Sequence, residues 1–205
     1  MRHNPDYEER DPGVVRRLIA ENPWATIVSN GAGGLVASHM PVLVDDSTDD
    51  LTVISHVGRP DERVHVLGDG ELLVIASGPY GYISPSWYPE EGPKVPTWNF
   101  SVAHCYGVPQ LLSEEENLRE LARLVHHFEQ HVACPVELDP EFGARLAKGT
   151  VGFRVPISRF VCKVKMSQNQ NEATQRRVLD LLREPGAYRN DALACEMERV
   201  LNHSL

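Results

Sequence analysis

Long hydrophobic runs are missing from the sequence. The longest apolar stretch, residues 71–76, has the length of a β-strand, whereas a membrane-spanning helix needs about 20 apolar residues. The first seven residues, Met1 to Tyr7, hold no apolar core of the kind that a signal peptide requires. We therefore expect neither a membrane segment nor a cleaved leader.

Cysteine is scarce, and no two cysteines form a Cys-x-x-Cys pair. The sequence has 4 of them, Cys105, Cys134, Cys162 and Cys195, which are widely spaced. A disulfide-stapled secreted domain or a zinc module needs denser or paired cysteines. The pattern predicts reduced thiols in a cytoplasmic protein.

Positive charge is also in short supply. Lys plus Arg total 20 against 29 Asp plus Glu, which gives a net charge of −9. Direct nucleic-acid binding needs a basic face to neutralise phosphates, so it is not expected here. A local basic pocket for one phosphate or carboxylate remains compatible with this charge.

Familiar catalytic loops are absent. The sequence holds no Gly-x-Ser-x-Gly elbow, no Walker loop and no Gly-x-Gly-x-x-Gly segment between a strand and a helix. The glycine-rich residues 30–34 lie inside an expected hairpin, where they form a turn rather than a phosphate cradle.

The overall amino-acid composition is that of an ordinary globular protein. The 205 residues include 41% hydrophobic and 24% charged side chains, and Gly and Pro number 15 each. This length fits one domain, or one domain with an appendage, and the turn-forming residues favour a mainly β fold.

Hydrophobic periodicity and turn signals predict a small antiparallel barrel with peripheral helices, an α+β protein that is mainly β. Strands are expected at residues 24–29, 35–44, 51–55, 71–77, 99–108, 150–155 and 160–165. Helices are expected at 12–22, 59–67, 113–132, 141–147, 171–182 and 192–201, with a structured loop at 80–96. Because the chain becomes helical and polar beyond Gln168, we place a barrel domain at 1–168 and a C-terminal helical arm at 169–205.

Hydroxyls, imidazoles and one guanidinium gather near the ends of two neighbouring strands. The residues are Ser38, His39, Ser55, His56 and Arg59. A phosphate or carboxylate is bound by such a set, in which a permanent cation is joined by short neutral donors. The alternative is that Ser38 and Ser55 cap the strands and that Arg59 pairs with Asp61 or Glu62.

Aromatic residues and prolines are concentrated at 80–96. Rigid, flat and amphipathic side chains in this density suit a planar cofactor or an oligomer interface, and the alternative is core filling. A 205-residue barrel could hardly bury them alone, so we expect a homodimer.

Several segments together resemble the PaiB family, the FMN-binding negative transcriptional regulators. They occur in family order over residues 1–170: Asn22-Pro23, Ser38-His39-Met40-Pro41, residues 55–59, 82–88, 95–99, 151–153 and 165–169. The resemblance implies a split β-barrel of the flavin-reductase and pyridoxamine-oxidase type. It further implies a homodimer with the cofactor, FMN first, in a groove between subunits and with a redox role.

The resemblance also implies roles for individual residues. Ser38, His39, Ser55, His56 and Arg59 would hold the FMN phosphate and ribityl chain. Trp98, Asn99, Lys165 and Gln168 would line the flavin end or reach across the dimer. The sequence indicates no substrate, and no metal is expected if the cofactor is FMN.

The chain departs from the family pattern after Arg59. Asp61 and Glu62 follow it, and His65 stands where the family usually has lysine. This keeps open a haem b alternative, with His56 or His65 as axial ligand and with the N–N bond-forming chemistry of the piperazate synthases. We favour His56, since His65 has an alternative interpretation as a solvated helix residue. A further alternative is a non-enzymatic transcriptional regulator or interaction protein.

Overall fold

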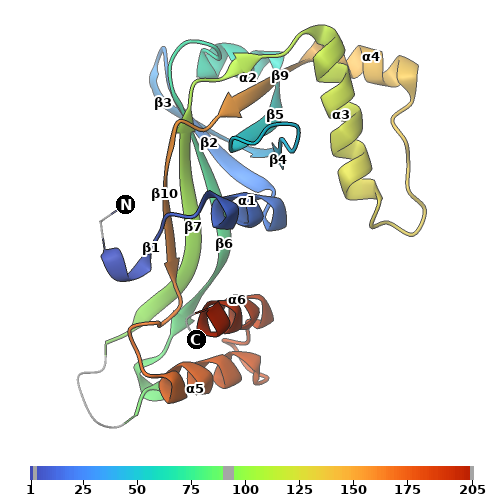
Figure 1. Ribbon diagram of the computed structural model, residues 1–205. Helices are drawn as coiled ribbons and strands as arrows, with labels where there is room; N and C mark the ends of the chain where they lie inside the picture. Colours follow the sequence, from blue (N-terminus) through green and yellow to red (C-terminus); the bar gives the residue numbers. More distant parts are fainter. Residues whose placement is uncertain (2–3, 90–94, 204–205) are drawn as a thin grey trace.

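The protein is built on two antiparallel sheets, as a computed structural model shows for residues 1, 4–89 and 95–203 (Figure 1). The six-stranded sheet has the order β1 (Glu8–Glu9), β10 (Arg159–Lys165), β7 (Thr97–Gly107), β6 (Leu72–Ile83), β2 (Trp24–Gly31), β3 (Gly34–Pro41). The four-stranded sheet has the order β4 (Leu43–Val44), β5 (Thr52–Gly58), β9 (Thr150–Pro156), β8 (Gln110–Leu111). The expected mixed, mainly antiparallel fold with peripheral helices is confirmed.

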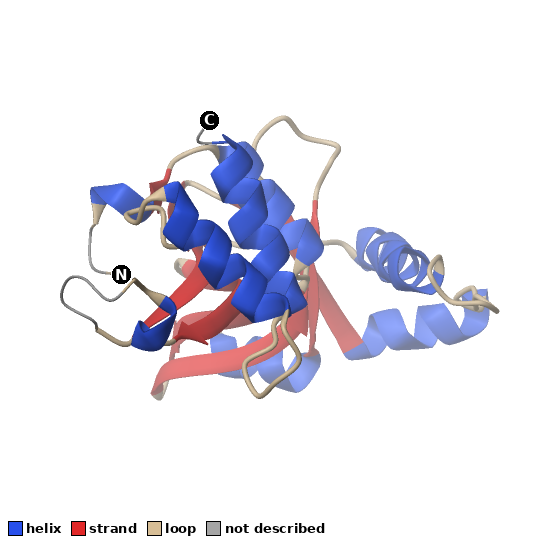
Figure 2. Cartoon of the chain, turned by 90° about the horizontal axis from the view of Figure 1, so that it is seen from below, coloured by secondary structure: helices blue, strands red, loops and turns tan. Residues whose placement is uncertain are grey.

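Helices surround the sheets at two places. Helices α1 (Pro12–Glu21), α5 (Glu172–Arg183) and α6 (Asp191–His203) lie along one side of the long strands β6, β7 and β10. Helices α3 (Glu114–Glu129) and α4 (Pro140–Gly149) pack on the four-stranded sheet and extend sideways from the body (Figure 2). The short helix α2 (Arg59–His65) follows β5 directly, and 3-10 turns form at Pro5–Tyr7 and Pro85–Trp87.

Local capping chemistry explains where two helices start. The Asp11 carboxylate accepts a hydrogen bond from the amide of Gly13, and Pro12 occupies the first helical turn. At α3, Ser113 and Glu116 form a reciprocal capping box, which starts the helix at the residue where the sequence predicts it.

The structure corrects three sequence-based boundaries. Strand β6 continues to Ile83, so Tyr80 and Tyr82 belong to a strand and not to the predicted loop. A register shift between Ser77 and Tyr80 lets the strand resume pairing with β7 beyond Pro79. Helix α3 ends at Glu129, short of the predicted end at residue 132, and Val132 lies exposed beyond it. Strand β5 runs on to Gly58, past the predicted end at residue 55.

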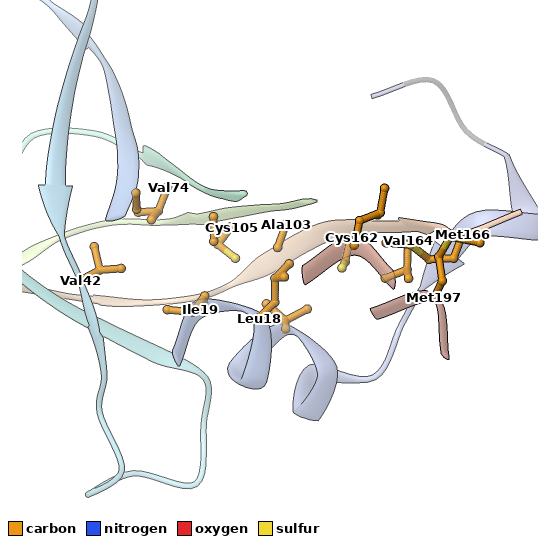
Figure 3. Packing of buried hydrophobic residues seen from close by; sticks show 14 of the residues in the cluster. Leu18, Ile19, Val42, Val74, Ala103, Cys105, Cys162, Val164, Met166 and Met197 are labelled. Atoms are coloured by element: carbon orange, nitrogen blue, oxygen red, sulfur yellow. The ribbon is translucent and has the colours of Figure 1, made fainter. Parts of the chain in front are cut away.

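The main core lies between the six-stranded sheet and helices α1, α5 and α6. Figure 3 shows Leu18 and Ile19 of α1 against Ala103 and Cys105 of β7. The C-terminal helices contribute to the same cluster through Val178, Leu179, Leu182, Leu193, Ala194 and Met197. Burial raises the pKa of the Cys105 and Cys162 thiols to about 12, so both behave as small apolar residues of this core.

The six-stranded sheet therefore has two different faces. We call the face toward α1, α5 and α6 the inner face; on β7 it carries Asn99, Ser101, Ala103 and Cys105, all buried. The opposite face, with Trp98, Phe100, Val102 and His104 on β7, is called the outer face. Among the described residues, no helix is both long and apolar enough to span a membrane.

Candidate functional site

The outer face presents large apolar side chains to solvent. Trp24 is 64% exposed, Leu35 84%, Tyr80 64%, Trp98 52% and Val161 38%. These residues come from strands β2, β3, β6, β7 and β10, so the exposed surface extends across the sheet. Exposed apolar side chains gathered on one face of a sheet are typical of binding or oligomer interfaces.

Aromatic rings cluster at one end of the outer face. Trp98 pairs directly with Tyr82 across β7 and β6, with ring centroids 6.1 Å apart, and Tyr80 lies 6.3 Å from Trp98. Tyr188 joins them at 5.4 Å from Tyr82, and Trp87 lies 6.2 Å from Tyr188. We call these five residues the aromatic cluster.

Tyr188 was missed by the sequence analysis. It lies in the connection between α5 and α6, far along the chain from the other four rings. Only the docking of the C-terminal helices brings it to the sheet, where Asn190 also donates a hydrogen bond to the carbonyl of Tyr80 at 2.9 Å. No motif near residue 188 signals this contact.

Two further predicted site residues, His39 and Lys165, share the outer face. His39 is exposed on the edge strand β3, in one cross-strand row with Thr26, Ile75 and His104. Lys165 pairs with Phe100 and donates a hydrogen bond to the Thr97 hydroxyl. Burial lowers the pKa of the half-buried His104, which keeps its imidazole neutral at pH 7.

Ser38 belongs to a different cluster, centred on a buried histidine. His65 is 1% exposed, with Nδ1 2.8 Å from the Ser29 hydroxyl and Nε2 2.9 Å from the Ser38 hydroxyl. We call Ser29, Ser38 and His65 the serine–histidine cluster. Burial lowers the pKa of His65, an effect that Asp61 only partly opposes, so the ring is neutral at pH 7.

The interpretation of His65 as a solvated helix residue is wrong, and a glycine explains why. Gly31 on β2 faces α2, and a Cβ atom at this position would lie 2.2 Å from the carbonyl oxygen of Val64. Because glycine lacks a Cβ atom, α2 packs closely against β2, and the last residue of α2, His65, is buried.

Ser55 and His56 lie on the four-stranded sheet, away from the outer face. The Ser55 hydroxyl donates to the carbonyl of Pro41 at 2.8 Å. His56 borders a cavity of about 10 Å³ beneath α3, which Asn117 and Glu120 also line. Burial lowers the pKa of His56. A space of this size holds about one water molecule and no larger ligand.

Arg59 faces α4 and one of its own helix neighbours. Its Nε donates to the carbonyl of Lys148 at 2.6 Å, and one terminal nitrogen lies 3.6 Å from the Glu62 carboxylate. The side chain is 50% exposed. The pairing with Glu62 that the sequence offered as an alternative is therefore present.

Asn99 and Gln168 hold the start of the C-terminal arm. Asn99, wholly buried on the inner face, donates to the Ser167 hydroxyl at 2.9 Å and contacts the Met197 sulfur at 3.4 Å. Gln168 closes the turn after β10 by bonding the backbone of Val164 and Met166, each at 2.6 Å. Asn99 thus points away from Trp98, its neighbour along the strand.

One chain does not bring the predicted residues into one place. Ser38 is in register with Ile27, Val74 and Cys105, and Trp98 lies seven residues further along β7 than Cys105. At roughly 3.3 Å per residue the two positions are separated by about 23 Å along the sheet. The aromatic cluster and the serine–histidine cluster therefore lie at opposite ends of the sheet, and Ser38, in the row of Cys105, points to its inner face.

Solved structures with the same fold include two that bind both a flavin and haem according to their descriptions. The FAD and haem binding protein of Mycobacterium smegmatis superposes with a TM-score of 0.61 at 13% identity, covering 83% of this chain and 78% of that one. The flavocytochrome Anf3 of Azotobacter vinelandii gives a TM-score of 0.61 at 15% identity, covering 83% and 75%. At these identities the likeness shows the fold, a split barrel, as the resemblance implied.

Sequence comparison identifies the family. Residues 1–159 match the family described as "Putative FMN-binding domain". The chain is 32% identical over 173 residues to the protease synthase and sporulation protein PAI 2 of Bacillus subtilis, covering 82% of each sequence. An uncharacterized protein of Emericella nidulans, AN0679, is 23% identical over 210 residues. The chain thus belongs to the PaiB family of FMN-binding-domain proteins.

Proposed function

We propose that the protein binds FMN at the outer face of its six-stranded sheet, between two copies of the chain. The observation that carries this proposal is the exposed aromatic cluster on the open face of a chain that belongs to an FMN-binding family. Trp98 and Tyr80 offer flat surfaces for the isoalloxazine ring, and their edges stay polar. Bound FMN would supply electron transfer, and the small-molecule substrate is unassigned.

We expect a homodimer because the outer-face residues are separated along the sheet. A two-fold axis that lies in the plane of the outer face and runs across the strands sets one end of the sheet against the other end of its partner. The aromatic cluster of one copy then lies near His39 of the second, and the site is complete only in the pair. The same contact covers Leu35 and Trp24, whose exposure is otherwise unexplained.

The phosphate end of FMN is assigned to His39 rather than to Ser38 or Arg59. His39 is exposed on the outer face of the edge strand β3, whereas Ser38 points to the inner face and bonds His65. The guanidinium of Arg59 already contacts Lys148 and Glu62.

Titration with FMN tests the proposal directly. We expect quenching of flavin fluorescence and a light-scattering mass of about twice 22.9 kDa for the wild type. Trp98→Ala should weaken FMN binding about tenfold, since one aromatic stacking contact is lost. Trp87→Ala, at the rim of the same cluster, is the matched control with a smaller effect. A protein that stays monomeric and binds no FMN would refute the proposal.

Haem is the second candidate, and a histidine on the outer face favours it. His104 is neutral and half-buried on the open face, as an axial ligand requires. His56 and His65 do not fit this role, because the first borders a cavity of only about 10 Å³ and the second holds a serine at each ring nitrogen. Haem titration tests this candidate. A Soret shift that is seen with the wild type and with His39→Ala, but not with His104→Ala, would establish haem binding. It would also make the N–N bond-forming chemistry a candidate activity again.

The regulator alternative has a less direct basis. A net charge of −9 disfavours direct contact with DNA, so regulation would act through another protein or through the product of a reaction. The four cysteines are free thiols, which fits the cytoplasmic location that we expect.

A further inference from the structure

We infer that Tyr188, from the C-terminal arm, is a further ring-binding residue of the flavin site. A segment beyond the family-matched residues 1–159 then takes part in cofactor binding. The inference rests on the proposed function for the identity of the ligand, a flat ring system. The position of Tyr188 against the sheet is a property of the chain itself.

The open edge of β6 lets a residue of the arm reach the outer face. Strand β2 pairs with β6 from Leu73 to Ile75, and among the described residues β6 has no strand partner on this side beyond Ile75. Helices α5 and α6 lie beside this end of the strand on its inner side (Figure 1). Tyr188, between these helices, reaches around the edge and contacts the ring of Tyr82.

Gly81 shows which face each residue of β6 belongs to. A Cβ atom at Gly81 would lie 2.8 Å from Leu193 Cδ2, so this position faces α6 on the inner face, and the missing side chain lets the helix come close. Tyr80 and Tyr82 flank Gly81 along the strand and therefore point to the outer face. Trp98, the cross-strand partner of Tyr82, points to the same face.

Asn190 fixes the connection between α5 and α6 on this edge. Its Nδ2 donates to the carbonyl of Tyr80 at 2.9 Å, and its Oδ1 accepts from the amide of Leu193 at 3.0 Å. Its own amide donates to the carbonyl of Leu182 at 2.7 Å. Because Asn190 is bonded to the strand and to both helices, Tyr188 is held in place before a ligand arrives. A ring that is already positioned loses little conformational entropy on binding.

Tyr188 keeps a free ring surface despite its contacts. It is 55% exposed, although its ring centroid lies 5.4 Å from that of Tyr82 and 6.2 Å from that of Trp87. Tyr82 is half-buried and also contacts Trp98, at 6.1 Å. Aromatic surface therefore continues from Trp98 through Tyr82 to Tyr188.

The size of the ligand makes this continuation relevant. The isoalloxazine system has three fused rings, whereas the indole of Trp98 has two, so a flavin stacked on Trp98 extends beyond the indole. The rings of Tyr82 and Tyr188 prolong the surface toward the edge of β6. Offset and edge-on contacts between rings at such distances are favourable.

Attachment of the arm does not account for the exposed ring. The arm is anchored in the main core by Val178, Leu182, Leu193 and Met197, all of which are buried. A ring that served only to hold the arm would be expected among these covered side chains.

Titration with FMN compares variants that change only this ring. Tyr188→Ala should weaken FMN binding about tenfold because one aromatic contact is lost, whereas Tyr188→Phe keeps the ring and should bind like the wild type. Phe142→Ala removes an exposed ring from α4 and is the matched control, with no expected effect. Light scattering establishes that each variant has the mass of the wild type.

Hydrogen exchange measures the same contact from the side of the arm. If Tyr188 contacts the ligand, FMN must stabilise the docked arm as much as the docked arm favours FMN. We expect FMN to slow amide exchange at residues 184–190 in the wild type and in Tyr188→Phe, and to do so much less in Tyr188→Ala. A residue that only supports the fold of the free protein would not produce this dependence on ligand.

The outcomes separate the inference from the proposed function. Unchanged FMN affinity in Tyr188→Ala, together with a loss in Trp98→Ala, would overturn the inference while the flavin proposal stands. A monomeric Tyr188→Ala protein would also overturn it, because Tyr188 would then act through the subunit interface. If the wild type binds no FMN, the flavin proposal fails, and haem titration decides the inference: a loss of haem affinity in Tyr188→Ala supports it, and an unchanged affinity or no haem binding overturns it.

Discussion

The two faces of the six-stranded sheet belong to the same strands, but helices cover only one of them. On the inner face, helices α1, α5 and α6 bury Ala103 and Cys105 completely, and the buried amide of Asn99 is bonded to the arm. On the outer face, Trp98 and Tyr80 remain more than half exposed. With the proposed function, stability depends on the inner face and cofactor binding on the outer face of the same strands.

The largest expected effect is on the inner face. Leu18→Ala removes a side chain that is 1% exposed in the main core, and we expect it to lower the free energy of unfolding by about 2–5 kcal/mol. Val161→Ala, on the outer face and 38% exposed, should cost about 1 kcal/mol or less. Urea denaturation of both variants checks this, and equal losses would contradict the assignment of the two faces.

The attachment of the arm to the inner face depends on a buried carboxylate. Glu196 on α6 is 3% exposed and receives two hydrogen bonds from Arg17 of α1, at 3.0 and 3.1 Å, and one from Arg199 at 2.6 Å. Glu196→Gln should lower the unfolding free energy by about 2 kcal/mol, since two guanidinium groups lose their shared anion.

Glu21→Gln is the control for this network. Glu21 contacts the same two arginines but is 44% exposed, so its loss should cost about 0.5 kcal/mol. Thermal unfolding compares the two variants. A larger effect at Glu21 than at Glu196 would mean that the arm is not held by the buried carboxylate.

The outer face should control association instead of stability. Val161→Arg places a charge on this face, and we expect a monomer of about 23 kDa by light scattering, with the unfolding free energy of the monomer changed by about 0.5 kcal/mol. Phe128→Arg, at an exposed position of α3, should leave the dimer intact. Dissociation by the α3 variant alone would place the interface elsewhere.

The smallest expected effect is on pH dependence. Burial lowers the pKa of His56, His65 and His104 in the folded protein below the unfolded value of about 6.5. The unfolded chain therefore binds more protons near pH 6, so the folded state is most stable above about pH 6.5 and loses stability as the pH falls.

His56→Gln should reduce this loss. Unfolding measured at pH 7 and pH 5 should show a smaller difference for His56→Gln than for the wild type. His126→Gln, which changes an exposed histidine of α3, should follow the wild type. A steeper pH dependence in His56→Gln would mean that His56 is stabilised in its charged form.

The order and type of the elements were accessible from local sequence. Proline and aspartate at the start of α1 and the capping box of α3 act within one helical turn, so their effect does not depend on distant residues. Alternation along β7, which is also a local property, puts His104 and Cys105 on opposite faces. The family motifs predicted the split barrel, which the comparisons confirm.

The composition of the site was less accessible. Ser38, Ser55, His56 and Arg59 are close in sequence, but they lie on two sheets and one helix, and their partners are Pro41, Lys148 and Glu62. Tyr188 joins the aromatic cluster from the arm. Contacts between elements that are far apart in sequence depend on packing, which periodicity does not report.

By itself, the sequence determined which segments become strands and helices and which family the chain belongs to, because capping, alternation and motif order are local properties. The tertiary structure decided which side chains face each other. The close approach of α2 at Gly31 buries His65 between two serines, and the docking of α1, α5 and α6 on one side leaves the other face of the sheet open. Both outcomes result from the packing of elements that are distant in the chain.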